Sequence, residues 1–311
     1  MTSDHGKELA ALLQRIEAAP SRFYAEKLRR SGLAPTPKPA ALARLSLTTR
    51  DELVRDQLAH LPHGTRRYAD AGPPVRAGVN GSGTRLLVLT WTAADLARER
   101  AAGARVFTAL GVTPGMRVAN TLPGGLATPG SLLLGDVMEA LGALDIPLGA
   151  VSSNVGARAA WELFDRVHPD VLVLDASSAG SLLAAAPPLG RPWWQGIVWL
   201  QTDARCLGWP ALPPAAGFGG WQRTWLAVPE ATSFVAHSCP VGRFHPDDAV
   251  VVELVDWADD PATPLDEVAA VALTPLGIDT PVLRYLSDLR ARCIDECACG
   301  SAVPGLELTS P

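Results

Sequence analysis

Short apolar runs alternate with helical patterns along residues 1–185. The runs at 86–90 and 171–175 predict buried strands, because they are short, rich in Leu and Val, and bounded by turn residues. Residues 8–31 and 92–110 carry apolar positions at helical spacing and predict helices. Helices that alternate with fully apolar strands predict an α/β layer in which the strands are largely parallel and are flanked by helices.

The pattern changes after residue 185. Pro- and Gly-rich connections now separate short predicted strands, which lie at residues 196–200, 224–228, 250–256 and 268–274. Such spacing is typical of a small antiparallel sheet or a distorted barrel. We therefore predict an α/β protein of two subdomains, residues 1–185 and 186–311.

The composition excludes several classes of function. The chain has 311 residues, a formal net charge of −5 and scattered Lys and Arg, which argues against nucleic-acid binding. No uninterrupted apolar run reaches the roughly 18 residues of a membrane span. The polar start, residues 1–7, is unlike a signal peptide, so the expected location is cytoplasmic.

Cysteine and histidine form the sharpest pattern in the chain. Cys239, His245, Cys297 and Cys299 offer three thiolates and one imidazole, a complete tetrahedral set for zinc. With all four positions filled, the zinc would be structural and would join the ends of the predicted small sheet. Two alternatives stay open: buried free cysteines with a surface histidine, and Cys293 as a substitute ligand.

A glycine-rich stretch, residues 80–85, precedes the strand predicted at 86–90. Its glycines allow backbone amides to approach an anion, and the hydroxyls of Ser82 and Thr84 can donate to phosphate oxygens. Arg85 adds a positive charge. The alternative is an ordinary glycine turn.

The segment Pro281-Val-Leu-Arg284-Tyr285-Leu-Ser-Asp288, followed by Cys297-Ala-Cys299-Gly300, resembles the phenylacetate–CoA ligase-like branch of the adenylate-forming superfamily. The resemblance implies the fold of the family's N-terminal domain and the zinc set above. It also implies that Asp288 binds the ribose of ATP or AMP, and that Ser82, Gly83, Thr84 and Arg85 bind its phosphates. Thr84 and Glu230 would be the catalytic residues, with Glu230 holding Mg²⁺.

The chain departs from the family pattern in several places. The glycine loop is about two residues short, and Pro229 replaces the threonine that precedes the family's glutamate, leaving Glu230 as a weakened ligand or a solvated loop acid. The sequence stops at Pro311, before the lid domain that carries the family's catalytic lysine. We therefore expect ATP-dependent ligation to be weakened or lost.

Two kinds of function remain open. The first is an enzyme that acts on an aryl or acyl carboxylate, or on its adenylate or thioester, with or without a separate protein that supplies the lid. The second is a non-catalytic scaffold subunit, a homodimer that partners a biosynthetic enzyme. The resemblance places the acyl pocket at residues 121–130, and tryptophans of the second half could line it or could belong to the core or an interface: Trp193, Trp194, Trp199, Trp209, Trp221 and Trp225.

Overall fold

The structure is a computed structural model that describes residues 3–19, 21–32, 39–123, 129–185, 194–202, 220–256 and 268–309. Its α-helices are α1 (Ser3–Ala18), α2 (Arg22–Ser31), α3 (Arg50–Ala59), α4 (Ala93–Ala109), α5 (Pro129–Leu141), α6 (Asn154–Val167) and α7 (Ala176–Ala184). Its strands are β1 (Arg76–Asn80), β2 (Leu87–Trp91), β3 (Arg117–Asn120), β4 (Leu144–Pro147), β5 (Val171–Leu174), β6 (Gly196–Gln201), β7 (Trp221–Val228), β8 (Thr232–Ser238), β9 (Phe244–Pro246), β10 (Val250–Val255), β11 (Ala269–Pro275), β12 (Tyr285–Ile294) and β13 (Gly305–Thr309).

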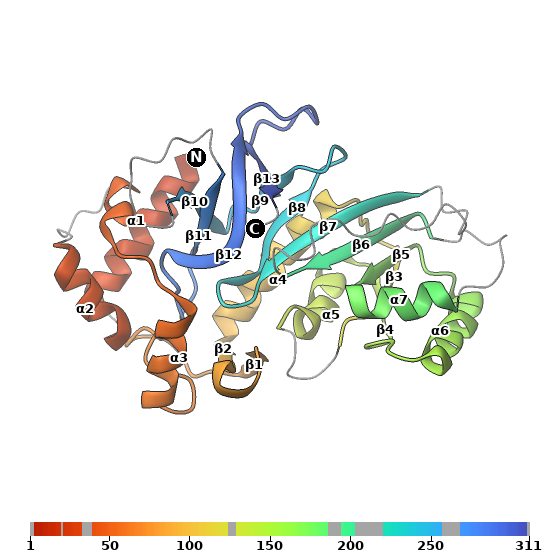
Figure 1. Ribbon diagram of the computed structural model, residues 1–311, viewed down its shortest axis with the longest axis horizontal. Helices are drawn as coiled ribbons and strands as arrows, with labels where there is room; N and C mark the ends of the chain where they lie inside the picture. The colour runs from red at the N-terminus through yellow and green to blue at the C-terminus, as the bar shows by residue number, and fades with distance from the viewer. Residues whose placement is uncertain are drawn as a thin grey trace.

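Eleven of the described strands form one sheet, in the order β10-β11-β12-β13-β9-β8-β7-β6-β5-β3-β4 (Figure 1). Strands β3 to β7 pair in parallel, and the remaining pairs are antiparallel. The predicted α/β fold with an added antiparallel sheet is therefore confirmed. The sheet runs without a break across residue 185, because β5 pairs with β6. The division into two subdomains stays a prediction.

Helices cover both faces of the parallel half, which explains why its strands are apolar throughout. On β5, Val171 and Val173 pack with α4 and α5, whereas Leu172 and Leu174 pack with α6 and α7 on the other face. Successive side chains of a strand point to opposite faces, so both sets must be apolar. The strand is therefore an uninterrupted apolar run because helices bury both of its faces.

The N-terminal helices pack beside the antiparallel half (Figure 1). The single helix predicted over residues 8–31 is wrong, because the chain forms α1 and α2 there as separate helices. Ser21 begins the second one: its hydroxyl accepts a hydrogen bond from the Tyr24 N–H (3.1 Å), which caps the helix. Among the described helices, none combines the length and the hydropathy that crossing a bilayer requires.

Candidate functional site

The predicted Cys₃His residues come together at the end of the antiparallel sheet. Cys239 follows β8, His245 lies on β9, and Cys297 and Cys299 follow β12. Their ligand atoms all lie within 4.8 Å of one another. The alternative of a surface histidine is excluded, because His245 is only 3% exposed.

The spacing of the cluster fits a tetrahedral metal ion. Zinc bound by thiolates at about 2.3 Å separates two sulfurs by about 3.8 Å. The Cys239 and Cys297 sulfurs lie 3.8 Å apart, and Cys299 Sγ lies 3.3 Å from His245 Nε2. Cys293 is not among the clustered ligands, and its sulfur lies 3.6 Å from Asp295. These four residues could therefore hold one ion.

Two local turns position the cysteine ligands. The Gly242 N–H donates to the Cys239 carbonyl (2.9 Å), and the Gly300 N–H donates to the Cys297 carbonyl (3.0 Å). Both glycines have positive φ, 78° and 81°, which side chains rarely adopt. His245 Nδ1 lies 3.1 Å from the carbonyl oxygen of Val303, so a proton on Nδ1 leaves Nε2 free as the ligand atom.

The glycine-rich stretch forms the turn of the β1–β2 hairpin. Residues 81–85 are exposed, and the Ser82 hydroxyl makes no capping bond to the short 3₁₀ helix Gly83–Arg85. The Arg85 side chain is 65% exposed and lies 3.2 Å from Asp51. The hydroxyls of this turn therefore remain open to solvent and to an anion.

Arg50, the first residue of α3, closes the base of this turn. Its Nη2 donates to the carbonyl oxygens of Asn80 (3.0 Å) and Arg85 (2.9 Å). A Cβ at Gly81 would lie 2.4 Å from the same nitrogen, so glycine is required there. The guanidinium therefore fixes the shape of the loop.

Glu230 lies in the turn between β7 and β8 and is held by the same arginine. Its Oε1 forms an ion pair with Arg50 and accepts a hydrogen bond from Asn80 Nδ2 (2.8 Å). The residue is 8% exposed, so the alternative of a solvated loop acid is wrong. The predicted magnesium ligand is instead bound to a cation supplied by the chain.

Asp288 lies on β12 with its side chain exposed, three residues after the buried Tyr285. Burial raises the pKa of Tyr285; the charge of Arg50 opposes this rise, and that of Asp288 adds to it. Arg85 also acts on the same phenol. Buried and exposed residues alternate along β12, so Tyr285 and Asp288, three positions apart, point to opposite faces of the strand.

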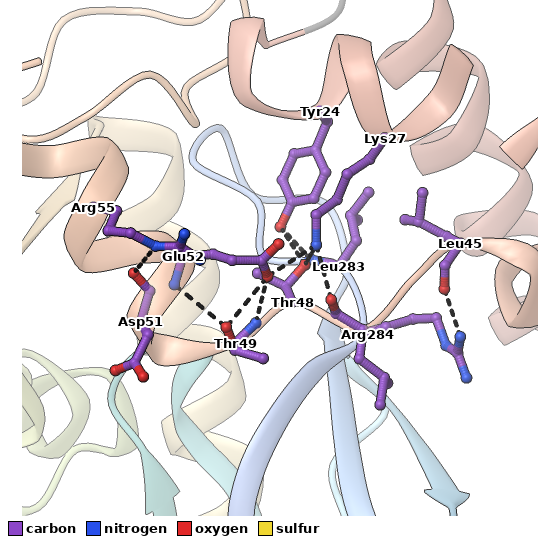
Figure 2. A network of polar contacts seen from close by, with 11 residues as sticks. Tyr24, Lys27, Leu45, Thr48, Thr49, Asp51, Glu52, Arg55, Leu283 and Arg284 are labelled. Carbon is purple, nitrogen blue, oxygen red and sulfur yellow. Dashed lines mark hydrogen bonds and ion pairs between the residues drawn. The ribbon is translucent and has the colours of Figure 1, made fainter. Parts of the chain in front are cut away.

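A polar network holds the start of α3 against β12 (Figure 2). The Thr48 N–H donates to the Arg284 carbonyl, and the Thr48 carbonyl accepts from the Leu286 N–H, both at 2.9 Å. Lys27 donates to the Leu47 carbonyl (2.8 Å) and to Glu52 (3.1 Å). These contacts position Arg50, two residues beyond Thr48.

Arg284 has a structural role in this network. Its guanidinium is 4% exposed and donates to the carbonyl oxygens of Ala43 (3.0 Å) and Leu45 (2.5 Å), as Figure 2 shows for Leu45. It also pairs with Glu253 at 3.3 Å. The arginine of the family-like segment therefore anchors the residues before α3.

The predicted acyl pocket is described only in part. Residues 124–128, Trp193 and Trp209 lie outside the described residues. Trp199 and Trp225 are buried in the cores on opposite faces of the sheet, and Trp194 and Trp221 pack at the edges of these cores. Those four tryptophans pack with the core clusters of the parallel sheet, as one of the alternatives predicted.

Sequence reasoning missed Arg50 and Asn80 as residues of the site. The segment that contains Arg50 was interpreted only as the start of a helix. Asn80 was interpreted only as the first residue of a glycine turn. Only the fold brings them to Glu230, and no local pattern could have paired them.

The fold is that of adenylate-forming CoA ligases. A 2-hydroxyisobutyryl-CoA ligase in an open conformation, in complex with 2-HIB-AMP and CoA, superposes with a TM-score of 0.84 at 18% identity, over 96% of this chain and 72% of that one. The same ligase in the postadenylation state gives 0.83 at 19%, over 97% and 65%. Mycobacterium smegmatis MbtA gives 0.55 at 14%, over 98% and 59%.

The chain thus spans between 59% and 72% of these neighbours' length. At such low identity the likeness shows the fold alone. The sequence matches no protein-family model and no curated protein.

Proposed function

We propose that the chain is a phenylacetate–CoA ligase-like protein that binds an aryl or acyl carboxylate in its activated form, an adenylate or thioester. One observation carries this: Arg50 holds an exposed turn that offers the hydroxyls of Ser82 and Thr84, within a fold shared with a ligase solved with 2-HIB-AMP. Ser82, Gly83, Thr84 and Arg85 would bind the phosphate, and Asp288 would accept hydrogen bonds from the ribose hydroxyls. Thr84 would contact the reacting phosphate.

We expect little ATP-dependent ligation by this chain. The turn of residues 81–85 is short, Pro229 offers neither a hydroxyl nor an N–H, and Glu230 is already paired with Arg50. Electrostatic stabilisers of an adenylation transition state are each worth about 100- to 1,000-fold in rate. Weak or absent ATP–pyrophosphate exchange is the expected result.

Calorimetric titration with AMP and with an acyl-sulfamoyl adenosine, a stable adenylate mimic, tests the proposed ligand. Asp288→Ala should weaken binding at least tenfold, because it removes a charged acceptor for two hydroxyls. Glu139→Ala, which removes an exposed acid from α5, is the matched control. Absence of binding to the wild type at millimolar ligand would reject the function.

We further propose that Cys239, His245, Cys297 and Cys299 hold a structural zinc ion. Zinc there would join the β8–β9 turn to the turn after β12, and a closed four-ligand site supplies stability rather than chemistry. Metal analysis should find about one equivalent, which Cys297→Ser loses and Cys293→Ser retains. Well under one equivalent in wild-type protein, with freely titratable thiols, would contradict the assignment.

The alternative is a non-catalytic subunit, a homodimer that partners a biosynthetic enzyme. The Arg50–Glu230 pair favours it, since that pair occupies the acid that a ligase would use for magnesium. If a folded, zinc-loaded protein binds no nucleotide in the titrations, the result would support this alternative.

A further inference from the structure

The carboxylate of Glu230 already has a fixed cation. Arg50 contacts Glu230 with Nη1, while its Nη2 is held by the two carbonyl oxygens at the ends of the glycine loop. The Arg50 side chain is 19% exposed and that of Glu230 7%. Both partners are therefore largely withdrawn from water, where an ion pair is stronger than at the surface.

Magnesium does not fit beside Glu230 in this arrangement. Mg²⁺ requires near-octahedral oxygen ligands and keeps several waters, so it needs open space around a carboxylate. The Oε1 atom of Glu230 is shared by Arg50 and Asn80. A divalent ion would lie against a guanidinium that two carbonyls hold in place, and the like charges would repel.

The charges around the loop favour a ligand with a single phosphate. Three cations, Arg50, Arg66 and Arg85, stand against three anions, Glu230, Asp51 and Asp288, which gives a net charge of 3 − 3 = 0. No net positive charge is therefore left to neutralise a triphosphate without magnesium, whereas one phosphate group can be accommodated. Arg85 can turn to it, because an ion pair as exposed as that with Asp51 contributes little.

We propose that Arg50 takes the place of the divalent cation, and that the site binds a nucleoside with one phosphate, free or esterified to an acyl group, without metal. Arg50 supplies the fixed positive charge and holds the loop in its binding shape. This inference rests on the proposed function and names the ligand class of the same site.

The two roles of Glu230 predict opposite effects of Glu230→Gln. If Glu230 held magnesium, losing its charge would weaken nucleotide binding. If Glu230 only neutralises Arg50, glutamine keeps the acceptor for Asn80 and leaves the arginine charge unopposed. AMP and the acyl-sulfamoyl adenosine should then bind the variant about tenfold more tightly.

The experiment is calorimetric titration of wild type, Glu230→Gln, Arg50→Ala and Arg50→Lys, each with magnesium or with EDTA. We expect wild-type affinities to agree within about twofold in the two buffers, and Arg50→Ala to lose at least tenfold in EDTA. Arg55→Ala controls for removing an arginine from the same helix, and it should bind as the wild type does. Thermal unfolding of every variant confirms that it folds.

Two results separate the ideas. Wild-type binding that requires magnesium, together with weaker binding by Glu230→Gln, would overturn the metal-free site and leave the proposed function standing. Failure of every folded variant to bind either ligand would overturn both.

Discussion

Replacing Glu99 by glutamine should change how stability depends on pH. Glu99 lies on α4, is 4% exposed, and accepts a hydrogen bond from the Ser233 N–H at 3.1 Å. With Arg66 and Glu230 it lines a cavity of about 20 Å³. Burial raises the pKa of Glu99 from 4.5 to about 7, although hydrogen bonds from Thr232 and Ser233 oppose the rise.

The sign follows from proton binding. Between about pH 4.5 and 7 the folded state binds more protons at Glu99 than the unfolded state does, so stability falls as pH rises through this window. A pKa difference of about 7 − 4.5 = 2.5 corresponds to roughly 3 kcal/mol once both states are ionised. About 2 kcal/mol of this is lost between roughly pH 5.5 and 8.5. Glutamine does not titrate and removes the loss.

Urea unfolding followed by tryptophan fluorescence, across roughly pH 5.5 to 8.5, measures the effect. The unfolding free energy of Glu99→Gln minus that of the wild type should grow by about 2 kcal/mol over this range. Glu139→Gln, at an exposed position on α5, should show no such trend. A difference that stays constant with pH would mean that Glu99 ionises normally, and the argument from burial would be refuted.

Two further predictions concern packing. Tyr24→Phe should cost about 1–3 kcal/mol, because the buried hydroxyl accepts from the Leu283 N–H at 2.8 Å and the variant leaves that donor unpaired; an unchanged urea midpoint would contradict this. Gly196→Ala should cost about 1–3 kcal/mol, since its Cβ would lie 2.2 Å from the Trp221 indole. Gly180→Ala, with nothing within 4 Å, is its control, and equal midpoints for the two alanine variants would contradict the packing argument.

The strands that could be predicted are those whose burial leaves a continuous apolar run. β5 and β6 fall within a residue of their predicted ranges, because they are buried throughout and nearly all of their side chains are apolar. β12 alternates between buried and exposed positions, and its charged residues interrupt any apolar run. Only the family resemblance predicted this strand. The place of β13 between β12 and β9 could not be predicted, since strand order depends on contacts distant in sequence.

The candidate site divides in the same way. The Cys₃His residues could be predicted because cysteine and histidine are typical metal ligands and recur here at short spacing. The structure brings all four together. Arg50 was missed because its function depends on Asn80, Arg85 and Glu230, which only the folded sheet brings near. Pairing between distant charges is invisible to a local pattern.

The contacts between the start of α3 and β12 have a consequence for biosynthesis. Tyr24 contacts Leu283, and Thr48 contacts residues 284 and 286, so α2 and the start of α3 are secured by a segment that is synthesised more than 200 residues later. β13, at residues 305–309, then lies between β9 and β12, inside the sheet. Such long-range pairing slows folding, because long loops must close before any contact rewards them. During synthesis, the apolar faces of α1 and α2 therefore stay exposed until the later strands have been made. Chaperones can bind these two helices throughout that time.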